Sequence, residues 1–411
     1  MNPNVTLDDP CAQLAAEIDA QKRKISSLTL KLQQDQGHPE QAEDDQRNLV
    51  AANAALTTLW DKWNALGCPK LGSPVVSPIS GGQPVFTPRF AYVANDGNAR
   101  NISAFAIEAS GAFSSLLGSP FTAGELPWSI AVDPAGKFAY VANNASNDLS
   151  SFVVNANGTL TPAVGSPFAA GVNPIFVAVH PTGNFVYSAN RGSDSVSAFV
   201  VNANSGVLTP VAGTPYAVGH WPASVAVHPE GKFLYTANFG SNNVSAFAID
   251  VNNGMLTEVN GSPFAAGPGS GSVTVDPFGK FAFVANIAAN AYPYLGGDPG
   301  SVSVFAIELN GGLSQVNGSP FAAGNEPVAV VVDPMGKHVL VANAKSNDVS
   351  VFALNANNGS LILTGGSPFA AGQSPGSVTV DGSGRFVYVA NRNSDNVSAY
   401  TINANGVLIP C

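Results

Sequence analysis

Along most of the chain, apolar residues alternate with small or polar ones in short runs that end in Val-Ala-Asn or a close variant. Phe138–Asn143 is the clearest of these runs. The closing Asn recurs seven times, at Asn95, Asn143, Asn190, Asn238, Asn286, Asn343 and Asn391. The successive intervals are 48, 47, 48, 48, 57 and 48 residues, which is one fixed period with one insertion. Such a period is typical of a propeller or a solenoid.

The repeat that runs from Pro222 to Gly267 divides into four predicted strands, over 223–228, 233–238, 244–249 and 255–264. Four antiparallel strands in about 48 residues make one propeller blade. The turn Asp133-Pro134-Ala135-Gly136 fits the link between the first two strands of a blade, because Asp, Pro and Gly each occupy the turn position they favour. The pattern therefore predicts a mainly β protein, a seven-bladed β-propeller of four-stranded antiparallel blades over residues 71–411.

The two ends of this region predict how the ring closes. The last repeat stops at Gly406–Cys411 and lacks the Gly-Ser-Pro segment that follows in other repeats. That segment is present at the other end, because Leu71-Gly72-Ser73-Pro74 matches Leu117-Gly118-Ser119-Pro120. We therefore expect residues 71–76 to pair with the C-terminal strand, 406–411, which would remove an open sheet edge.

Residues 1–70 follow a helical period instead. Asp9 and Pro10 fit a helix start, Gly37-His38-Pro39 breaks the pattern, and Gly67 ends it. The two apolar seams are Cys11, Leu14, Ile18, Ile25, Leu28, Leu32 and then Ala42, Leu49, Ala52, Leu56, Leu59, Trp63, Leu66. This spacing predicts an antiparallel α-helical coiled-coil hairpin, a candidate element for self-association.

Composition narrows the function classes. The 411 residues are 45% hydrophobic and 11% charged, with a net charge of −10, which argues against a nucleic-acid partner. No run of roughly 18 apolar residues predicts a membrane span, and the first 30 residues lack the apolar core of a signal peptide. No Cys or His spacing indicates a zinc, haem or other cofactor site, so we expect no metal and no cofactor.

The three cysteines are far apart in sequence, yet Cys11, Cys68 and Cys411 are expected to meet where the hairpin joins the propeller. A Cys11–Cys68 disulfide is the first choice and Cys68–Cys411 the second, and Cys11 as a plain apolar seam residue is the alternative. The remaining thiol, with Cys411 as the first candidate because it ends the chain, could link subunits. A disulfide would fit a secreted, cell-surface or periplasmic protein, with a cytoplasmic location left open.

The repeat motifs also resemble a known family. Val-Asp-Pro-x-Gly-Lys-Phe-x-Tyr-Val-Ala-Asn, then Ser-Asn-x-Val-Ser-x-Phe, then Leu-Thr-Pro-Val-x-Gly-Ser-Pro-Phe resemble the bacterial YVTN-type repeats of the lactonase-like seven-bladed propellers. The resemblance covers about residues 71–411. The family includes sugar lactonases similar to 6-phosphogluconolactonase, so the resemblance implies a lactonase activity. In those enzymes a His commonly follows the Pro that opens a blade. The residues at that position here are Trp128, Ile175, Ala223, Val328 and Gly376.

The histidines of the repeats lie elsewhere. His180 and His228 take the Asp position of the turn, where a turn-capping role is expected, and His338 replaces a strand Phe as a scaffold residue. Because no His follows the blade-opening Pro, we do not transfer the hydrolase activity from the resemblance, and we predict no catalytic residues.

Departures from the repeat gather on the loops that follow the second and fourth strands, which share one face of a propeller. We expect the ligand site among Trp128, Arg191, His220, Trp221, Tyr292, Tyr294, Glu326 and Arg392. Exposed aromatic side chains and an Arg pair would suit a carbohydrate, peptide or protein ligand. The alternative is that Trp128 and Trp221 only plug the channel.

Two functions follow. The first is a non-catalytic binding or scaffold propeller of the bacterial envelope or exterior, with its ligand on the loop face and the hairpin for assembly. The alternative is a lactonase-like hydrolase that acts on a sugar lactone. The sequence favours the first function, because no activated nucleophile, acid/base pair or metal set can be assembled from it.

Overall fold

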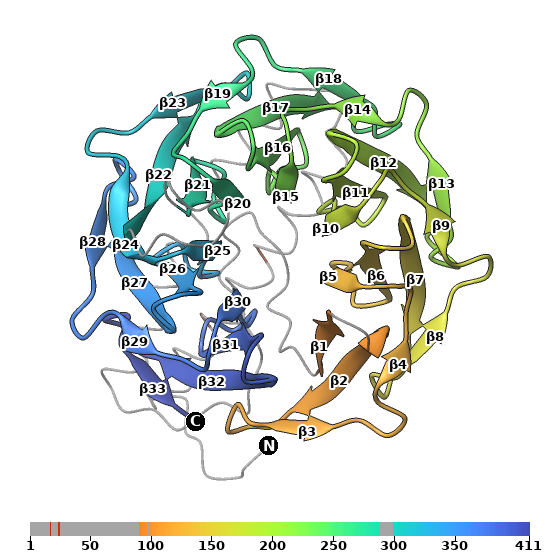
Figure 1. The fold of residues 1–411 in the computed structure, drawn as a ribbon, viewed down its shortest axis with the longest axis horizontal. Coiled ribbons are helices and arrows are strands. Elements are labelled where there is room, and N and C mark those ends of the chain that lie inside the picture. Colours follow the sequence, from red (N-terminus) through yellow and green to blue (C-terminus); the bar gives the residue numbers. More distant parts are fainter. Residues whose placement is uncertain (1–16, 18–23, 25–89, 97–98, 288–298) are drawn as a thin grey trace. The chain divides into compact units, whose positions relative to one another are not determined.

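The computed structural model describes residues 17, 24, 90–96, 99–287 and 299–411. Residues from Phe90 onward form seven antiparallel sheets arranged around a common axis, as Figure 1 shows. The predicted seven-bladed β-propeller is therefore confirmed. Of the region predicted to form a helical hairpin, only Glu17 and Lys24 are described, and both are helical and exposed. The hairpin and its boundary at residue 70 stay predictions.

Each sheet is named here as a blade, in chain order. Blades 1 and 2 contain β1 (Phe90–Asn95), β2 (Asn101–Ile107), β3 (Phe113–Ser115), β4 (Phe121–Thr122), and β5 (Pro127–Val132), β6 (Phe138–Asn143), β7 (Asp148–Val154), β8 (Leu160–Pro162), β9 (Phe168–Ala169). Blades 3 and 4 contain β10 (Pro174–Val179), β11 (Phe185–Asn190), β12 (Ser195–Val201), β13 (Leu208–Pro210), β14 (Tyr216–Ala217), and β15 (Pro222–Val227), β16 (Phe233–Asn238), β17 (Asn243–Ile249), β18 (Leu256–Glu258), β19 (Phe264–Ala265).

Blades 5 to 7 continue the same order. They contain β20 (Ser270–Val275), β21 (Phe281–Asn286), β22 (Pro299–Ile307), β23 (Leu313–Gln315), β24 (Phe321–Asn325), then β25 (Pro327–Val332), β26 (His338–Asn343), β27 (Asp348–Leu354), β28 (Leu361–Leu363), β29 (Phe369–Ala370), and β30 (Pro375–Val380), β31 (Phe386–Asn391), β32 (Asn396–Ile402), β33 (Leu408–Pro410). The first strand of a blade lies nearest the axis, and the shortest strands lie at the rim (Figure 1). Within the described ranges, no helix is both long enough and apolar enough to span a bilayer.

The outer strand differs from the prediction. Residues 255–264 were expected to form one fourth strand, but β18 and β19 are two short strands that both pair with β17. A turn separates them, in which the Ser262 amide donates to the Val259 carbonyl over 3.0 Å. The Ser262 hydroxyl also accepts a hydrogen bond from the Ala246 amide at 3.1 Å. The turn therefore replaces part of the strand ladder.

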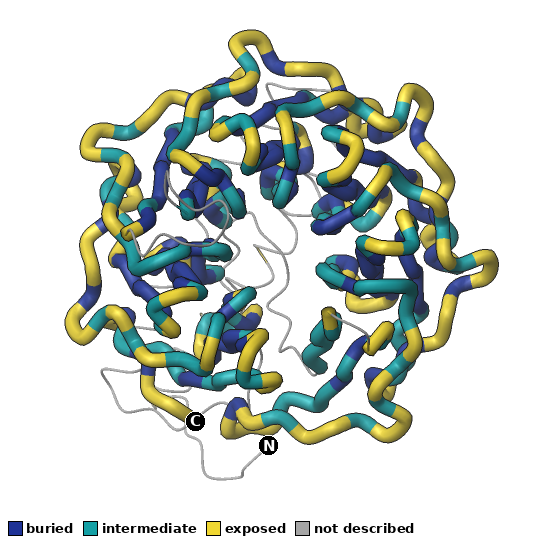
Figure 2. Tube along the Cα trace, viewed as in Figure 1, coloured by how far each residue is buried: buried dark blue, intermediate teal, exposed yellow. Residues whose placement is uncertain are grey.

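The apolar core lies between neighbouring blades, as the buried segments in Figure 2 show. Tyr140, Tyr187 and Tyr235 of the second strands are completely buried, and each such side chain stabilises the fold by roughly 1.5–3 kcal/mol. The Tyr235 hydroxyl donates to the Gly311 carbonyl of the next blade at 3.1 Å. Desolvation raises the pKa of these phenols far above the usual value, so they stay protonated.

A glycine of each blade packs on one residue of the preceding blade, which is the first residue of β1 in blade 1 and the first residue of the second strand in blades 2 to 7. Gly206 of blade 3 has φ +70°, and a Cβ there would lie 2.6 Å from the Phe138 ring of blade 2. The other junctions pair Gly158 with Phe90, Gly254 with Phe185, Gly311 with Phe233, Gly359 with Phe281, Gly406 with His338 and Gly111 with Phe386. His338 therefore occupies a Phe position, as its prediction as a scaffold residue required.

The contacts between blades 7 and 1 close the ring. The Tyr388 hydroxyl donates to the Gly111 carbonyl at 3.0 Å, and the Tyr388 ring stacks on Phe113 with centroids 4.5 Å apart. These residues are at opposite ends of the propeller sequence, so closure does not depend on neighbours in the chain. The predicted pairing partner of 406–411, residues 71–76, lies outside the described residues, and that pairing stays a prediction.

Candidate ligand-binding site

The second strand of a blade ends beside the start of the first strand, because Pro174 pairs with Asn190 and Pro222 pairs with Asn238. The closing Asn is fixed by side-chain hydrogen bonds. The Asn190 amide donates to Ser195 at 3.2 Å and to Ser197 at 2.9 Å. The backbone at this end of each blade is thus held in place. The residue that follows the Asn differs from blade to blade, as Asp96, Asn144, Arg191, Phe239, Ile287, Ala344 and Arg392.

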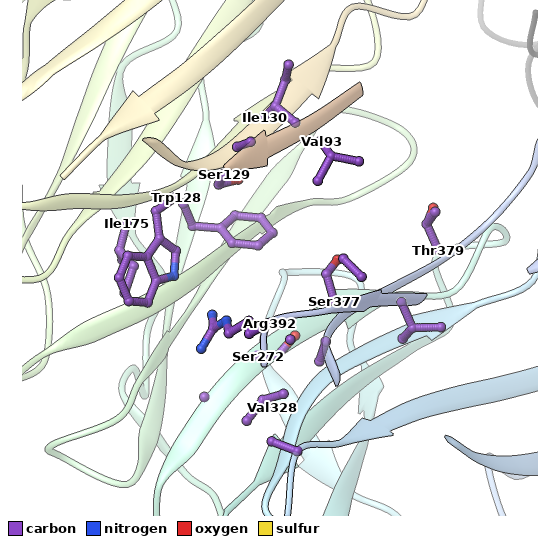
Figure 3. A pocket seen from close by; sticks show the side chains of 18 of the residues that line it. Val93, Trp128, Ser129, Ile130, Ile175, Ser272, Val328, Ser377, Thr379 and Arg392 are labelled. Atoms are coloured by element: carbon purple, nitrogen blue, oxygen red, sulfur yellow. The ribbon is translucent and has the colours of Figure 1, made fainter. Parts of the chain in front are cut away.

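A cavity of about 610 Å³ opens at this end of the blades. The residue after the blade-opening position lines it in blades 2 to 7, as Trp128, Ile175, Ala223, Gly271, Val328 and Gly376. Five of the residues that follow the closing Asn also line it, as Arg191, Phe239, Ile287, Ala344 and Arg392. Because blades 2 to 7 contribute equivalent positions and blade 1 contributes β1, the cavity lies on the propeller axis. Figure 3 shows Trp128, Ile175, Val328 and Arg392 around this common space.

Arg392 links two blades that are not neighbours in the ring. Its guanidinium carbon lies 5.0 Å from the ring centroid of Trp128, so blade 7 reaches blade 2 past blade 1. Its Nε is 3.7 Å from an oxygen of Asp96 in blade 1. A Cβ on Gly376 would lie 2.5 Å from that Nε, so the glycine leaves the space that Arg392 occupies. The cation–π geometry favours a guanidinium at this place.

Arg191 lies in a second aromatic group, on the loops of blades 3 and 4. Its guanidinium carbon is 5.6 Å from the ring centroids of both Trp221 and Phe239. The His220 ring stacks on Trp221 with centroids 4.8 Å apart. Asp194 fixes both residues, since one carboxylate oxygen lies 2.8 Å from His220 Nδ1 and the other accepts the Trp221 amide at 2.8 Å.

The carboxyl group of Asp194 is held ionised. Desolvation acts to raise its pKa, but hydrogen bonds from His220 and the Trp221 amide outweigh this effect and lower the pKa below the usual value near 3.8. Among the described residues that line the cavity, Glu326 is the acidic one, and its side chain is only 14% exposed. One of its oxygens is 3.9 Å from the Lys345 ammonium group.

The structure brings together four of the predicted site residues in the cavity wall: Trp128, Arg191, Glu326 and Arg392. His220 and Trp221 reach the site through Arg191. Tyr292 and Tyr294 lie outside the described residues. Trp128 and Trp221 are both half-buried, and their alternative role as plugs stays a prediction. The sequence analysis missed Phe239, although it follows Asn238 just as Arg191 follows Asn190.

The buried histidines belong to the other end of the blades. His180 Nε2 lies 2.9 Å from the Gly231 carbonyl of the next blade, and its Nδ1 accepts the Thr182 amide at 3.2 Å. These partners require a neutral ring with its proton on Nε2. Burial lowers the pKa of His180, and the bond to Gly231 offsets this only in part. The predicted turn-capping role is confirmed, with an added contact between blades.

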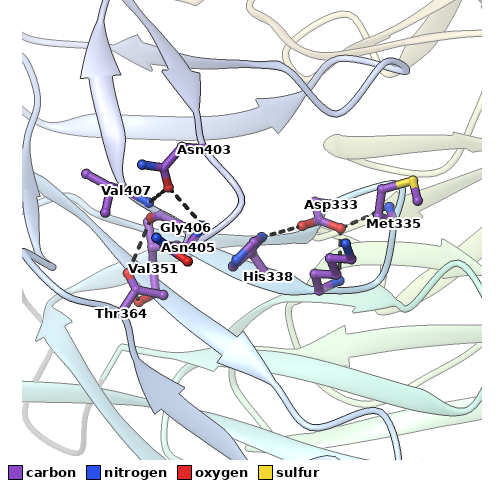
Figure 4. Close-up of polar contacts among 10 residues, drawn as sticks. Asp333, Met335, His338, Val351, Thr364, Asn403, Asn405, Gly406 and Val407 are labelled. Carbon is purple, nitrogen blue, oxygen red and sulfur yellow. Dashed lines mark hydrogen bonds and ion pairs between the residues drawn. The ribbon is translucent and has the colours of Figure 1, made fainter. Parts of the chain in front are cut away.

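His228 repeats this arrangement, with Nε2 at 3.0 Å from the Gly279 carbonyl and the Glu230 amide donating to Nδ1 at 3.1 Å. His338 instead pairs with Asp333 at 2.7 Å, beside the hairpin that contains Gly406 (Figure 4). Over the part of the chain that the structure describes, no group of three His, Cys, Asp or Glu side chains is placed to hold a metal ion. Cys411 has a free, exposed thiol. The second choice of disulfide, Cys68–Cys411, is therefore wrong, because the Cys411 thiol is unbonded. Cys11 and Cys68 lie outside the described residues, so the Cys11–Cys68 disulfide stays a prediction.

The family model described as lactonase, seven-bladed β-propeller, matches residues 86–177, 167–269 and 260–368. Together these segments cover more than half of the chain without a gap. The chain therefore belongs to the lactonase family of seven-bladed β-propellers. None of the curated proteins matches it significantly in sequence.

Solved structures share the fold at low sequence identity. A Bacteroides uniformis protein proposed to be a 6-phosphogluconolactonase has a TM-score of 0.64 and 22% identity over 78% of this chain and 94% of its own. The periplasmic gluconolactonase of Pseudomonas aeruginosa has a TM-score of 0.64 and 21% identity over 77% and 93%. The hydrazine synthase of Kuenenia stuttgartiensis has a TM-score of 0.60 and 17% identity over 82% and 99%. At these identities the likeness shows the fold alone.

Proposed function

We propose that this protein is a lactonase-like hydrolase that opens a sugar lactone in the axial cavity. The observation that carries the proposal is that the cavity of a lactonase-family propeller is lined by two arginines, one carboxylate and an aromatic wall. Its volume lies within the range of roughly 300–1,000 Å³ that is usual for small-molecule sites. A single sugar ring fits that space. The sequence analysis favoured non-catalytic binding, and family membership together with this lining now favours hydrolysis.

We assign each step of the proposed reaction to a residue that lines the cavity. A water molecule attacks the lactone carbonyl carbon, and Glu326 accepts the proton of that water as general base. Arg392 donates hydrogen bonds to the carbonyl oxygen, where negative charge develops in the transition state. The bond between the carbonyl carbon and the ring oxygen then breaks, and the ring oxygen takes the proton from Glu326. The product is an open-chain hydroxy acid.

The test measures acid release from glucono-1,5-lactone and related sugar lactones, corrected for spontaneous opening. Wild-type protein should exceed the spontaneous rate. Glu326→Gln should lower kcat by roughly 10²- to 10⁴-fold, because it removes the base and keeps the side-chain shape. Arg392→Ala should lower it by about 10²- to 10³-fold. Glu258→Gln, an exposed carboxylate on the outer strand β18, is the matched control and should leave the rate unchanged.

A second candidate is a non-catalytic binding protein of the bacterial envelope or exterior, assembled through the N-terminal hairpin. It is favoured by one observation. The six residues that follow the blade-opening position and line the cavity are Trp128, Ile175, Ala223, Gly271, Val328 and Gly376, and none of these side chains can transfer a proton. A wild-type rate equal to the spontaneous rate, with measurable lactone binding by calorimetry, would decide for this candidate.

A further inference from the structure

Arg191 lines the axial cavity, and among the described residues no carboxylate forms an ion pair with it. Its guanidinium faces two aromatic rings. Two other arginines on the loops of the blades are paired, since Arg100 lies 2.8 Å from Glu125 and Arg392 lies 3.7 Å from Asp96. A guanidinium carries five donors in a plane, and contacts to ring faces leave those in-plane donors open.

The nearest carboxylate in the sequence has other partners than Arg191. Asp194 lies three residues further along the same loop, but both of its oxygens are already engaged, one by His220 and the other by the Trp221 amide. The same two bonds fix Trp221, whose ring in turn faces Arg191. The loop therefore holds a cation in place and directs the neighbouring carboxylate to His220 and the Trp221 amide.

We propose that Arg191 binds the carboxylate of a small hydroxy acid at the edge of the axial cavity. A carboxylate has the planar, two-oxygen shape that a guanidinium recognises through two parallel hydrogen bonds. The aromatic rings of Trp221 and Phe239 restrict the guanidinium, so less conformational freedom is lost when the acid binds. In the proposed reaction the carboxylate forms at Arg392, so the opened acid that Arg191 holds has moved away from the position of the lactone carbonyl. This inference rests on the proposed function only for the choice of acid.

The test titrates the full-length protein with sodium gluconate by isothermal calorimetry at fixed ionic strength. Sorbitol is the neutral comparison, because it has the same number of carbons and lacks the carboxylate. Gluconate should bind and sorbitol should bind much more weakly. Arg191→Gln should weaken gluconate binding by about 10- to 100-fold, because a charge-assisted pair is lost. Arg191→Lys should also weaken it, since an ammonium group keeps the charge and loses the planar fork.

Arg385→Gln is the matched control. Arg385 also faces an aromatic ring, with its guanidinium carbon 5.0 Å from the centroid of Phe386, but it lies at the other end of β31 and does not line the cavity. Its replacement should leave gluconate affinity unchanged. Equal binding of gluconate and sorbitol, or wild-type gluconate affinity in folded Arg191→Gln, would overturn the inference. Arg191-dependent gluconate binding without lactone hydrolysis would support the inference and reject the proposed hydrolase.

Discussion

The two ends of the blades use the same repeat in different ways. At the end where the first strand turns into the second, Asp133 accepts the amides of Lys137 and Phe138, and Asp276 does the same in blade 5. His180 and His228 replace this Asp and still cap the turn. At the opposite end the Asn is fixed, while the next residue is Arg191 in blade 3, Phe239 in blade 4 and others elsewhere.

This difference shows at which end of the blades a substitution can change function without disturbing the fold. At the turn end, a changed side chain must still satisfy buried donors of its own turn and touch the next blade, so substitutions remain structural. At the cavity end, hydrogen bonds to the closing Asn hold the backbone, and the following side chain projects from a fixed position. We therefore expect changes at the turn end to alter folding and changes at the cavity end to alter ligand binding.

The largest expected effect comes from filling a junction between blades at the turn end. Gly206→Val should lower the free energy of unfolding by about 3 kcal/mol, because a side chain would overlap the Phe138 ring and would require a positive φ. Urea denaturation followed by circular dichroism measures it. Gly365→Val is the control, since a Cβ at Gly365 meets nothing within 4 Å. Equal stability of the two variants would contradict the role of the junction glycine.

The next largest effect is expected from replacing the closing Asn that holds the backbone at the cavity end of a blade. Asn190 is completely buried, and its amide nitrogen and oxygen are bonded to Ser195, Ser197 and Ser188. Asn190→Ala should destabilise the fold by about 2 kcal/mol, because buried hydroxyl groups lose their partner. Thermal and chemical unfolding of the variant measure this. Exposed Asn252→Ala should change stability by less than about 0.5 kcal/mol. Comparable losses would mean that Asn190 does not anchor the loop.

The smallest effect is a pH dependence at the turn end. The folded state lowers the pKa of His180 below its usual value of 6.5, so the unfolded chain binds this proton more readily. The contribution of His180 to stability is therefore present above pH 6.5 and is lost as the pH falls toward the lowered pKa. His180→Gln should show a smaller fall in unfolding free energy between pH 7.5 and pH 5 than wild type. Parallel curves over that range would contradict a neutral, buried His180.

The sequence predicted what repeats and could not predict what depends on neighbouring blades. The interval between the closing Asn residues was enough for seven blades, because each blade must bury its faces against the next. The split of residues 255–264 into β18 and β19 was missed, although Asn260-Gly261-Ser262-Pro263 is a sequence typical of a turn. The turn bonds that break the ladder involve Ala246 of another strand, which the local pattern does not reveal.

The site shows the same limit. The loops that carry Trp128, Arg191, Trp221 and Arg392 could be identified as departures from the repeat. That Arg191 faces Trp221 and Phe239, and that Arg392 reaches Trp128, depends on contacts between different blades. Gly376 looked like an ordinary small residue in the sequence, yet it leaves the space for Arg392. Contacts of this kind depend on how the blades are placed in the ring, so the repeat pattern alone does not predict them.

The contact between Gly111 and Phe386 gives the propeller the connectivity of a cycle. Linear repeat arrays need special capping repeats, because their first and last units each expose one uncovered face. Here every blade has both a predecessor and a successor, and blade 7 precedes blade 1 as blade 2 precedes blade 3. The packing between blades is thus the same whether or not two neighbouring blades are covalently linked. A circularly permuted chain, with new termini in another outer hairpin, would keep all seven junctions.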